Sequence, residues 1–163
     1  MENEPCSKWL NKPWMYSKPK NVETLAGWRK TWLNFIIEYA KRQNIHLINI
    51  NDLKQMHPFN MMDQEAFDDI INSLVQQRYG EWWDKNKKML RIYWLSLEKW
   101  AEYVAQTARN KEKSVIYGIK DIVELEPRLT AMPEKDIKTI IRLMVELNLA
   151  RWIDKRKMVI KIK

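Results

Sequence analysis

The stretch Trp82-Trp83-Asp84-Lys85 occurs again as Trp152-Ile153-Asp154-Lys155, at an offset of 152 − 82 = 70 residues. The chain before each stretch repeats as well, because its apolar positions coincide at the same offset. In the first copy they are Phe67, Ile70, Ile71, Leu74 and Val75, and in the second Ile137, Ile140, Ile141, Met144 and Val145. A repeat of this kind indicates two copies of one supersecondary unit, at residues 67–92 and 137–162.

Each copy predicts a helix followed by a hairpin. Apolar residues that recur at intervals of three and four form the stripe that an amphipathic helix buries. A tryptophan-bearing strand, a basic turn and a second strand then follow. The first copy places them at 80–84, 85–88 and 89–94, and the second at 150–154, 155–157 and 158–162. Since a helix and a hairpin form the C-terminal half of a winged-helix domain, we expect an α+β, mostly helical fold of two tandem winged-helix domains packed without a linker.

Local signals place the elements before the first hairpin. Thr24 is expected to cap a first helix that runs to about Asn44. Residues 46–50 alternate and are rich in β-formers, which predicts a short strand. Asn51 is expected to cap a short second helix, and the repeated helix starts near Asp63.

The second half predicts the same order of elements. Ser96 is expected to cap a helix, residues 114–117 form a short strand, and residues 119–125 a short helix. Pro133 suits the first turn of the last helix, which is expected to reach about Leu149. The predicted domains are an arm at 1–22, a first winged helix at 23–95 and a second at 96–163.

The first 22 residues combine prolines with aromatic side chains. Pro5, Pro13 and Pro19 exclude a continuous helix, and they alternate with aromatic residues such as Trp9 and Trp14. A disordered leader is one reading. We favour an extended arm that docks its aromatic side chains on a partner, because proline presets such a segment and lowers its entropic cost of binding.

Composition limits the class of protein. The net charge of +8 allows an acidic protein, nucleic acid or an anionic membrane as a partner. The single cysteine, Cys6, excludes an internal disulfide and suits a reducing compartment. No apolar run approaches the length of a membrane span, and the N-terminus lacks the features of a signal peptide. A cytoplasmic protein is expected.

The sequence gives little support to catalysis. His46 and His57 lie at no metal-ligand spacing with each other or with Cys6. The three glycines are too few and too scattered to form a phosphate-binding loop. We therefore expect no enzyme activity, no metal and no cofactor.

Three segments carry a resemblance to a known family. They are Asn21-Val22-Glu23-Thr24 leading to Trp32, Glu81-Trp82-Trp83-Asp84-Lys85-Asn86-Lys87 running on to Trp94, Glu98 and Trp100, and Ser114-Val115. The chain resembles the vacuolar protein sorting-associated protein 25 family, the small two-copy winged-helix subunits of the ESCRT-II complex. The resemblance covers nearly the whole chain, and it implies the same fold as the repeat.

The resemblance also implies a function and two sets of site residues. The family has a proline-proline-aromatic-aromatic hook that inserts into the larger ESCRT-II subunits, and its counterparts here are Pro13, Trp14 and Tyr16. Lys12 replaces the first proline and Met15 displaces the second aromatic. The second winged helix of the family binds an ESCRT-III subunit, so the implied protein is a non-enzymatic adaptor for membrane remodelling and protein sorting. The candidate ESCRT-III-facing residues are Arg142, Leu143, Lys155 and Lys157.

The alternative is a tandem winged-helix protein that binds nucleic acid in transcription. Such domains read the major groove with their third helix. The positions expected to face outward are Glu65, Asp69, Asn72, Ser73 and Gln76 in the first copy, and Lys135, Thr139, Arg142, Leu143 and Glu146 in the second. The first set holds two carboxylates and no basic residue, which disfavours nucleic acid. The basic turns are either solvated hairpin tips or contacts for an acidic helix or anionic lipid, which would place the protein at the periphery of a membrane.

Overall fold

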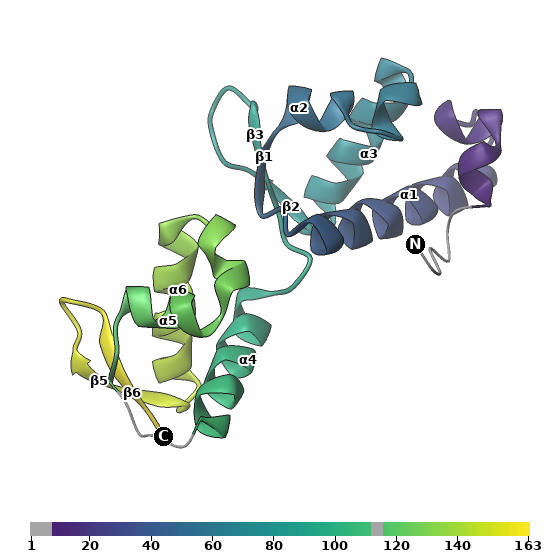
Figure 1. Cartoon of the computed structure of the whole chain (residues 1–163). Helices are drawn as coiled ribbons and strands as arrows, with labels where there is room; N and C mark the ends of the chain where they lie inside the picture. The colour runs from purple at the N-terminus through teal and green to yellow at the C-terminus, as the bar shows by residue number, and fades with distance from the viewer. Residues whose placement is uncertain (1–7, 112–115) are drawn as a thin grey trace. The chain divides into compact units, whose positions relative to one another are not determined.

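The computed structural model describes residues 8–111 and 116–163, and the chain divides into two compact units (Figure 1). The first unit ends at Trp94 and the second begins at Leu95. Residues 93–96 lead from the last strand of the first unit to the first helix of the second.

The first unit combines helices with a small antiparallel sheet. Its α-helices are α1 (Val22–Gln43), α2 (Ile50–Gln55) and α3 (Gln64–Gln76). Its strands β1 (Leu47–Asn49), β2 (Gly80–Trp82) and β3 (Met89–Ile92) pair in the order β1-β3-β2. The described part of this unit also contains the 3₁₀ helices η1 (Trp9–Asn11), η2 (Pro13–Tyr16) and η3 (Phe59–Met61). Helix α1 packs on α3, and α3 on β2.

The second unit repeats this arrangement. Its helices are α4 (Leu97–Asn110), α5 (Ile119–Leu125), η4 (Pro127–Ala131) and α6 (Glu134–Glu146). Its strands β4 (Ile116–Tyr117), β5 (Ala150–Asp154) and β6 (Val159–Ile162) pair in the order β4-β6-β5. Both units therefore have the order helix, strand, helix, 3₁₀ helix, helix and hairpin, and the prediction of two winged-helix domains is confirmed.

The repeat extends to the hydrogen-bonded register of the hairpins. Trp82 pairs with Leu90 in the first sheet, and Trp152 pairs with Ile160 in the second, both at the offset of 70. The backbone conformation between helix and hairpin repeats as well. Arg78 and Asn148, at the offset of 70, both have a positive φ, of 64° and 61°. The match in sequence thus reflects a match in backbone conformation.

Of the three predicted helix caps, one is confirmed and two are displaced. Ser96 accepts the capping N–H group of α4. The repeated helix α3 starts where it was predicted, and Asp63 caps it. Helix α1, however, is capped by Asn21, whose Oδ1 accepts the N–H of Glu23 at 2.9 Å, so Thr24 lies in the first turn. Likewise the side chain of Asn49, and not that of Asn51, caps α2. Asparagine caps helices more strongly than threonine, which favours Asn21 over Thr24, and the cap of α2 is the earlier of two asparagines.

The aspartate of each repeated stretch organises its turn. Oδ1 of Asp84 accepts the N–H groups of Met89 and Lys88, both at 2.9 Å, and the bond from Met89 in particular lowers the pKa of this carboxyl. Oδ1 of Asp154 accepts the N–H of Lys157 at 3.1 Å. The repeated aspartates therefore fix the hairpins, and the basic side chains between the strands are left exposed.

The tryptophans divide between core and surface. Trp32 and Trp100 are fully buried, one in each unit. Trp82 and Trp152, whose repetition on a strand favours a core position, are only half-buried. Trp94 stacks on His46 at a ring-centroid distance of 5.2 Å.

Candidate protein-binding site in the N-terminal segment

Residues 8–18 fold back on the first winged helix. The prediction of an extended arm is wrong for this part of the chain, because η1 and η2 form there. The prolines exclude an α-helix, but Pro13 is accommodated as the first residue of η2, where its missing N–H costs nothing. Pro5 and Cys6 lie outside the described residues.

The carbonyl of Met15 holds this segment on α1. It accepts two indole N–H groups, from Nε1 of Trp28 and Nε1 of Trp32, each at 2.8 Å. The side chain of Met15 is buried as well. Two hydrogen bonds that are shielded from water fix the backbone here, so the segment is an integral part of the first unit.

Tyr16 is an internal anchor. Its side chain is only 6% exposed, and its ring packs against that of Trp32 at a centroid distance of 5.6 Å. Its hydroxyl donates to the carbonyl of Leu10 at 2.6 Å, and burial raises its pKa. Of the three arm residues identified from the sequence, Tyr16 thus faces inward, while Pro13 and Trp14 lie at the surface.

The exposed part of the arm lies beside a surface hollow of about 470 Å³. The residues that line it are Leu10, Asn11, Pro13, Tyr16, Ser17, Met61 and Asp63. Trp14, on the same 3₁₀ helix as Pro13, is 61% exposed, and Met61 is 52% exposed. A large exposed indole on a 3₁₀ helix that also borders a partly apolar hollow is typical of a protein-binding surface.

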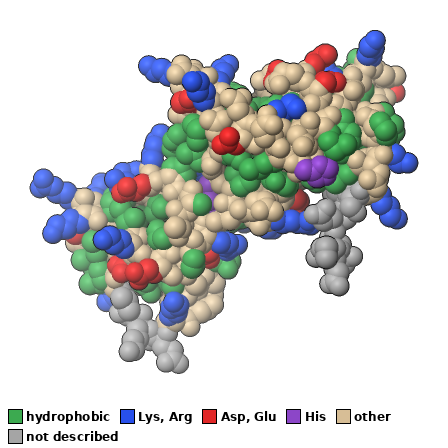
Figure 2. Space-filling model, turned by 45° about the horizontal axis from the view of Figure 1, so that its top comes forward, with side chains coloured by type: hydrophobic (Ala, Val, Ile, Leu, Met, Phe, Trp, Pro, Cys, Tyr) green, Lys and Arg blue, Asp and Glu red, His purple; other side chains and the backbone are tan. Residues whose placement is uncertain are grey.

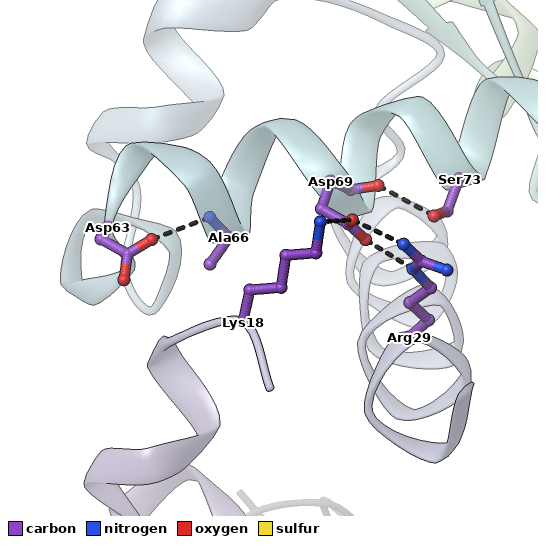
Figure 3. A network of polar contacts seen from close by, with 6 residues as sticks. All are labelled: Lys18, Arg29, Asp63, Ala66, Asp69 and Ser73. Carbon is purple, nitrogen blue, oxygen red and sulfur yellow. Dashed lines mark hydrogen bonds and ion pairs between the residues drawn. The ribbon is translucent and has the colours of Figure 1, made fainter. Parts of the chain in front are cut away.

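An ion-pair network ties the arm to α1 and α3 (Figure 3). The carboxylate of Asp69 on α3 accepts two hydrogen bonds from the guanidinium of Arg29, at 2.6 and 2.7 Å, and lies 2.9 Å from Nζ of Lys18. One carboxylate therefore joins three segments, and its two-point contact with arginine is the strongest geometry for such a pair.

The same contacts correct the expectation for the face of α3. Asp69 and Ser73 do not face outward: the side chain of Asp69 is 9% exposed, and Ser73 is buried with its hydroxyl donating to the carbonyl of Asp69 at 2.8 Å. Helix α1 covers this side of α3. The exposed charged residues of α3, a helix that the structure describes in full, are Glu65 and Asp68, and none is basic. This face offers no positive charge to a nucleic acid.

Replacing Asp69 with asparagine tests the network. Arg29 first, and then Lys18, lower the pKa of Asp69 below its ordinary value. A lowered carboxyl pKa stabilises the fold above the unfolded value of about 3.9, and the contribution is lost as pH falls through the folded value. Because the Arg29 side chain is 37% exposed, screening limits the effect to about 1 kcal/mol at neutral pH.

The measurement is urea unfolding of wild type and Asp69→Asn as a function of pH. The difference in unfolding free energy should be constant near neutrality and should shrink once the pH falls below about 4. Asp68→Asn is the matched control, since Asp68 is exposed on the same helix and should show no such difference. A difference that does not depend on pH would mean that the ion pairs contribute nothing.

The second winged helix presents the remaining candidates separately. Arg142 is exposed on α6, and Lys155 and Lys157 are exposed at the β5–β6 turn. Leu143, expected on the outward face, is half-buried, because it occupies the position that Ser73 has in the first unit. Only the three basic residues are therefore freely accessible.

Within residues 8–111 and 116–163, no group of three His, Cys, Asp or Glu side chains could hold a metal ion. His46 is buried, with Nε2 2.8 Å from Oδ1 of Asn44. No helix in these residues is long and apolar enough to cross a membrane.

Comparison with known proteins identifies the family. The family model described as "ESCRT-II complex subunit" matches residues 10–128, which is most of the chain. The chain belongs to the ESCRT-II subunit family. This membership confirms the resemblance seen in the sequence.

Individual relatives of this ESCRT-II family member are distant. Vacuolar protein sorting-associated protein 25 of Arabidopsis thaliana is 28% identical over 96 residues, which cover 56% of the chain and 50% of that protein. The alignment thus spans half the length of that relative.

The crystal structure of subunit VPS25 of the endosomal trafficking complex ESCRT-II has a TM-score of 0.70 at 21% identity, covering 95% of the chain and 96% of VPS25. A chain in the structure of the endosomal complex ESCRT-II (VPS22/VPS25/VPS36) has a TM-score of 0.71 at 16% identity, covering 99% of the chain and 100% of that chain. These likenesses show a shared fold.

Three residues of the arm region of this ESCRT-II family member were not identified as site residues from the sequence. Met61 contributes to the hollow, and Lys18 and Arg29 hold the arm through Asp69. The run Phe59-Asn60-Met61-Met62 carried no signal of exposure, because two of its three apolar residues are core residues. Long-range ion pairs leave no local pattern, and so the network could not be found from the sequence.

Proposed function

We propose that the chain is a non-enzymatic adaptor subunit of an ESCRT-II-like complex. It joins larger subunits through its N-terminal arm and first domain, and it recruits an ESCRT-III subunit through its second winged helix. In this role it acts in the cytoplasm, peripheral to membranes, in membrane remodelling and protein sorting. The family membership and the related complex that holds VPS22, VPS25 and VPS36 support the first partner.

The observation that carries the proposal is the exposure of Trp14. Its neighbours Met15 and Tyr16 are buried, so the indole is presented from a fixed backbone and not from a loose tail. Preorganisation lowers the entropic cost of binding, and tryptophan is the residue most enriched at interface hot spots. The departure from the family hook at Met15 is consistent with this proposal, because the Met15 side chain is buried and Trp14 is the exposed aromatic residue of η2.

The proposed binding site for an ESCRT-III subunit lies on the second domain. Arg142 on α6, with Leu143 beside it, and Lys155 and Lys157 at the turn are the proposed contacts for an ESCRT-III subunit. The exposed basic side chains suit an acidic helix of the partner. Alternation of charge on α6 argues against nucleic acid there, since Glu134 and Glu146 are exposed on the same helix.

A pull-down with a larger ESCRT-II subunit and an ESCRT-III subunit tests both ends. Trp14→Ala is expected to weaken binding of the larger subunit at least about thirtyfold, the loss typical of a hot spot, and to leave ESCRT-III binding unchanged. Arg142→Glu is expected to weaken binding of the ESCRT-III subunit and to leave binding of the larger subunit unchanged. Tyr79→Ala is the control, because Tyr79 is a similarly exposed aromatic of the first unit that lies outside the arm.

The proposal is contradicted if the intact chain captures neither partner. Loss of both partners with Trp14→Ala would instead contradict the separation of the two ends. Circular dichroism should show an unchanged fold for each of these surface variants, since exposed positions contribute little to stability.

A further inference from the structure

The outward face of the second sheet is basic and aliphatic. Strand pairing places Lys161 of β6 opposite both Ile116 of β4 and Arg151 of β5, so the three side chains form one row across the sheet. Ile116 is 50% exposed, and Arg151 is exposed as well. The opposite face of the sheet carries the buried Tyr117 and Ile160.

The face continues to the tip of the hairpin. Ile153 is 44% exposed, and Lys155, Arg156 and Lys157 follow in the turn. The strands and the turn are described in full, and Asp154 is their one acidic residue. Its Oδ1 is engaged by the backbone of the turn at 3.1 Å. Figure 2 shows Lys and Arg side chains next to hydrophobic ones on the surface of the second unit.

The equivalent row of the first sheet provides an internal comparison. There Arg91 pairs with Leu47 and Glu81, at the positions of Lys161, Ile116 and Arg151. Arg91 is 1% exposed, and its guanidinium carbon lies 4.3 Å from the centre of the Tyr93 ring. Its guanidinium also donates to the carbonyl of Ile92 at 2.6 Å. The hydroxyl of Tyr93 donates to Glu81 at 2.8 Å. In the first unit the central arginine of this face is thus buried, and the face contains an acid.

The second unit has the same backbone but the opposite surface. Glu81 is replaced by Arg151, and the half-buried Trp83 by the exposed Ile153. A buried arginine in the first sheet corresponds to Lys161, which is partly exposed. Because the fold is common to both units, the fold does not account for this difference.

We infer that the outward face of the second sheet, with the β5–β6 turn, binds the surface of an anionic lipid bilayer. Lys155, Arg156 and Lys157 would contact acidic headgroups, and Ile153 would enter the boundary between headgroups and acyl chains. The inference rests on the peripheral membrane location proposed above, and it adds anionic lipid to the ESCRT-III subunit as a ligand of Lys155 and Lys157.

The combination of side chains favours lipid over nucleic acid. Basic residues near an anionic membrane each contribute to binding, and an apolar side chain beside them adds the burial of hydrocarbon. Single-stranded nucleic acid, by contrast, is bound on exposed aromatic rings. The exposed apolar residues of this face are the aliphatic Ile116 and Ile153, which can neither stack on bases nor donate hydrogen bonds to phosphates.

Co-sedimentation of the full chain with vesicles tests the inference. The vesicles contain roughly three parts phosphatidylcholine to one part phosphatidylserine, or phosphatidylcholine alone, and no protein partner is present. Binding is expected only to the anionic vesicles. The triple variant Lys155→Ala, Arg156→Ala, Lys157→Ala should lose about fivefold in affinity for each charge, on the order of a hundredfold in total.

The first unit supplies the matched control. Lys85→Ala, Lys87→Ala, Lys88→Ala removes the same charge from the corresponding turn and should retain the binding. Ile153→Ser should weaken binding about tenfold while Ile153→Leu does not. These positions are exposed, and thermal unfolding should verify that each variant remains folded.

Three outcomes would overturn the inference. They are failure to bind anionic vesicles, equal losses for the two triple variants, and capture of duplex DNA instead of vesicles. Because the assay contains no ESCRT subunit, its failure leaves the pull-down result standing, and failure of the pull-down does not affect vesicle binding.

Discussion

Replacing Trp32 with alanine is expected to destabilise the first winged helix by about 3–5 kcal/mol, the usual cost of deleting a large buried side chain. Trp32 is fully buried, and its ring lies 4.8 Å from that of Trp9, 5.6 Å from that of Tyr16 and 5.7 Å from that of Phe35. The substitution leaves a cavity at the centre of this aromatic cluster. It also removes one of the two indole donors to the carbonyl of Met15.

The loss should therefore extend to the arm. With one hydrogen bond and the packing of Tyr16 removed, residues 8–18 should detach before the rest of the unit unfolds. Amide hydrogen exchange measures this, because it reports the opening of individual segments. Protection should fall in η2 and α1, and it should stay unchanged in α6.

The control is Trp14→Ala, the removal of an equally large but exposed indole. It should change the unfolding free energy by no more than about 0.5 kcal/mol. If the two variants were equally stable, the arm would not be part of the first domain, and the fixed presentation of Trp14 would be wrong.

The repeat explains why most of the fold could be predicted from the sequence. Helix stripes and alternating strands are local patterns, and the match of Trp82 to Trp152 carried the register of one hairpin onto the other. Ser96 could be identified as a cap because it directly precedes an amphipathic helix, and the apolar pattern likewise placed the start of the repeated helix near Asp63. Thr24 was expected to cap the first helix because the apolar stripe begins directly after it, yet the cap lies three residues earlier, at Asn21.

The candidate site was harder to predict, because tertiary contacts decide which residues are exposed. Proline content indicated an extended arm, but the indoles of Trp28 and Trp32 offered its carbonyl two buried donors. A helical wheel placed Asp69 on the outside of α3, whereas Arg29 approaches from another helix and draws it into an ion pair. Neither contact can be recognised from the spacing of residues in the sequence.

The role of Trp100 also depends on a distant partner. Like Trp94, Trp100 lies beside the join between the two copies in the sequence, a position that suggests a wedge at that junction. It lies instead in the core of the second unit, with the guanidinium of Arg128 5.0 Å from its ring. Arg128 in turn is held by Glu126, at 2.8 Å between Nε and Oε1.

Trp100→Ala is accordingly expected to cost the second winged helix about 3–5 kcal/mol. The substitution opens a cavity between α4 and the neighbouring helices, and it removes the aromatic face on which Arg128 rests. This loss is a large part of the roughly 5–15 kcal/mol that stabilises a typical domain. Exchange protection should therefore collapse in α6 and β5.

Tyr103→Ala is the matched control, since Tyr103 also lies against Arg128, at 4.9 Å, but is 47% exposed. It should cost no more than about 1 kcal/mol, the value of an exposed cation–π contact. The compact units each contain their own tryptophan-centred core, so protection in α1 and α3 should survive Trp100→Ala. Loss of protection throughout the chain would show that the two winged helices unfold as one, and that the pull-down variants cannot be assigned to separate ends.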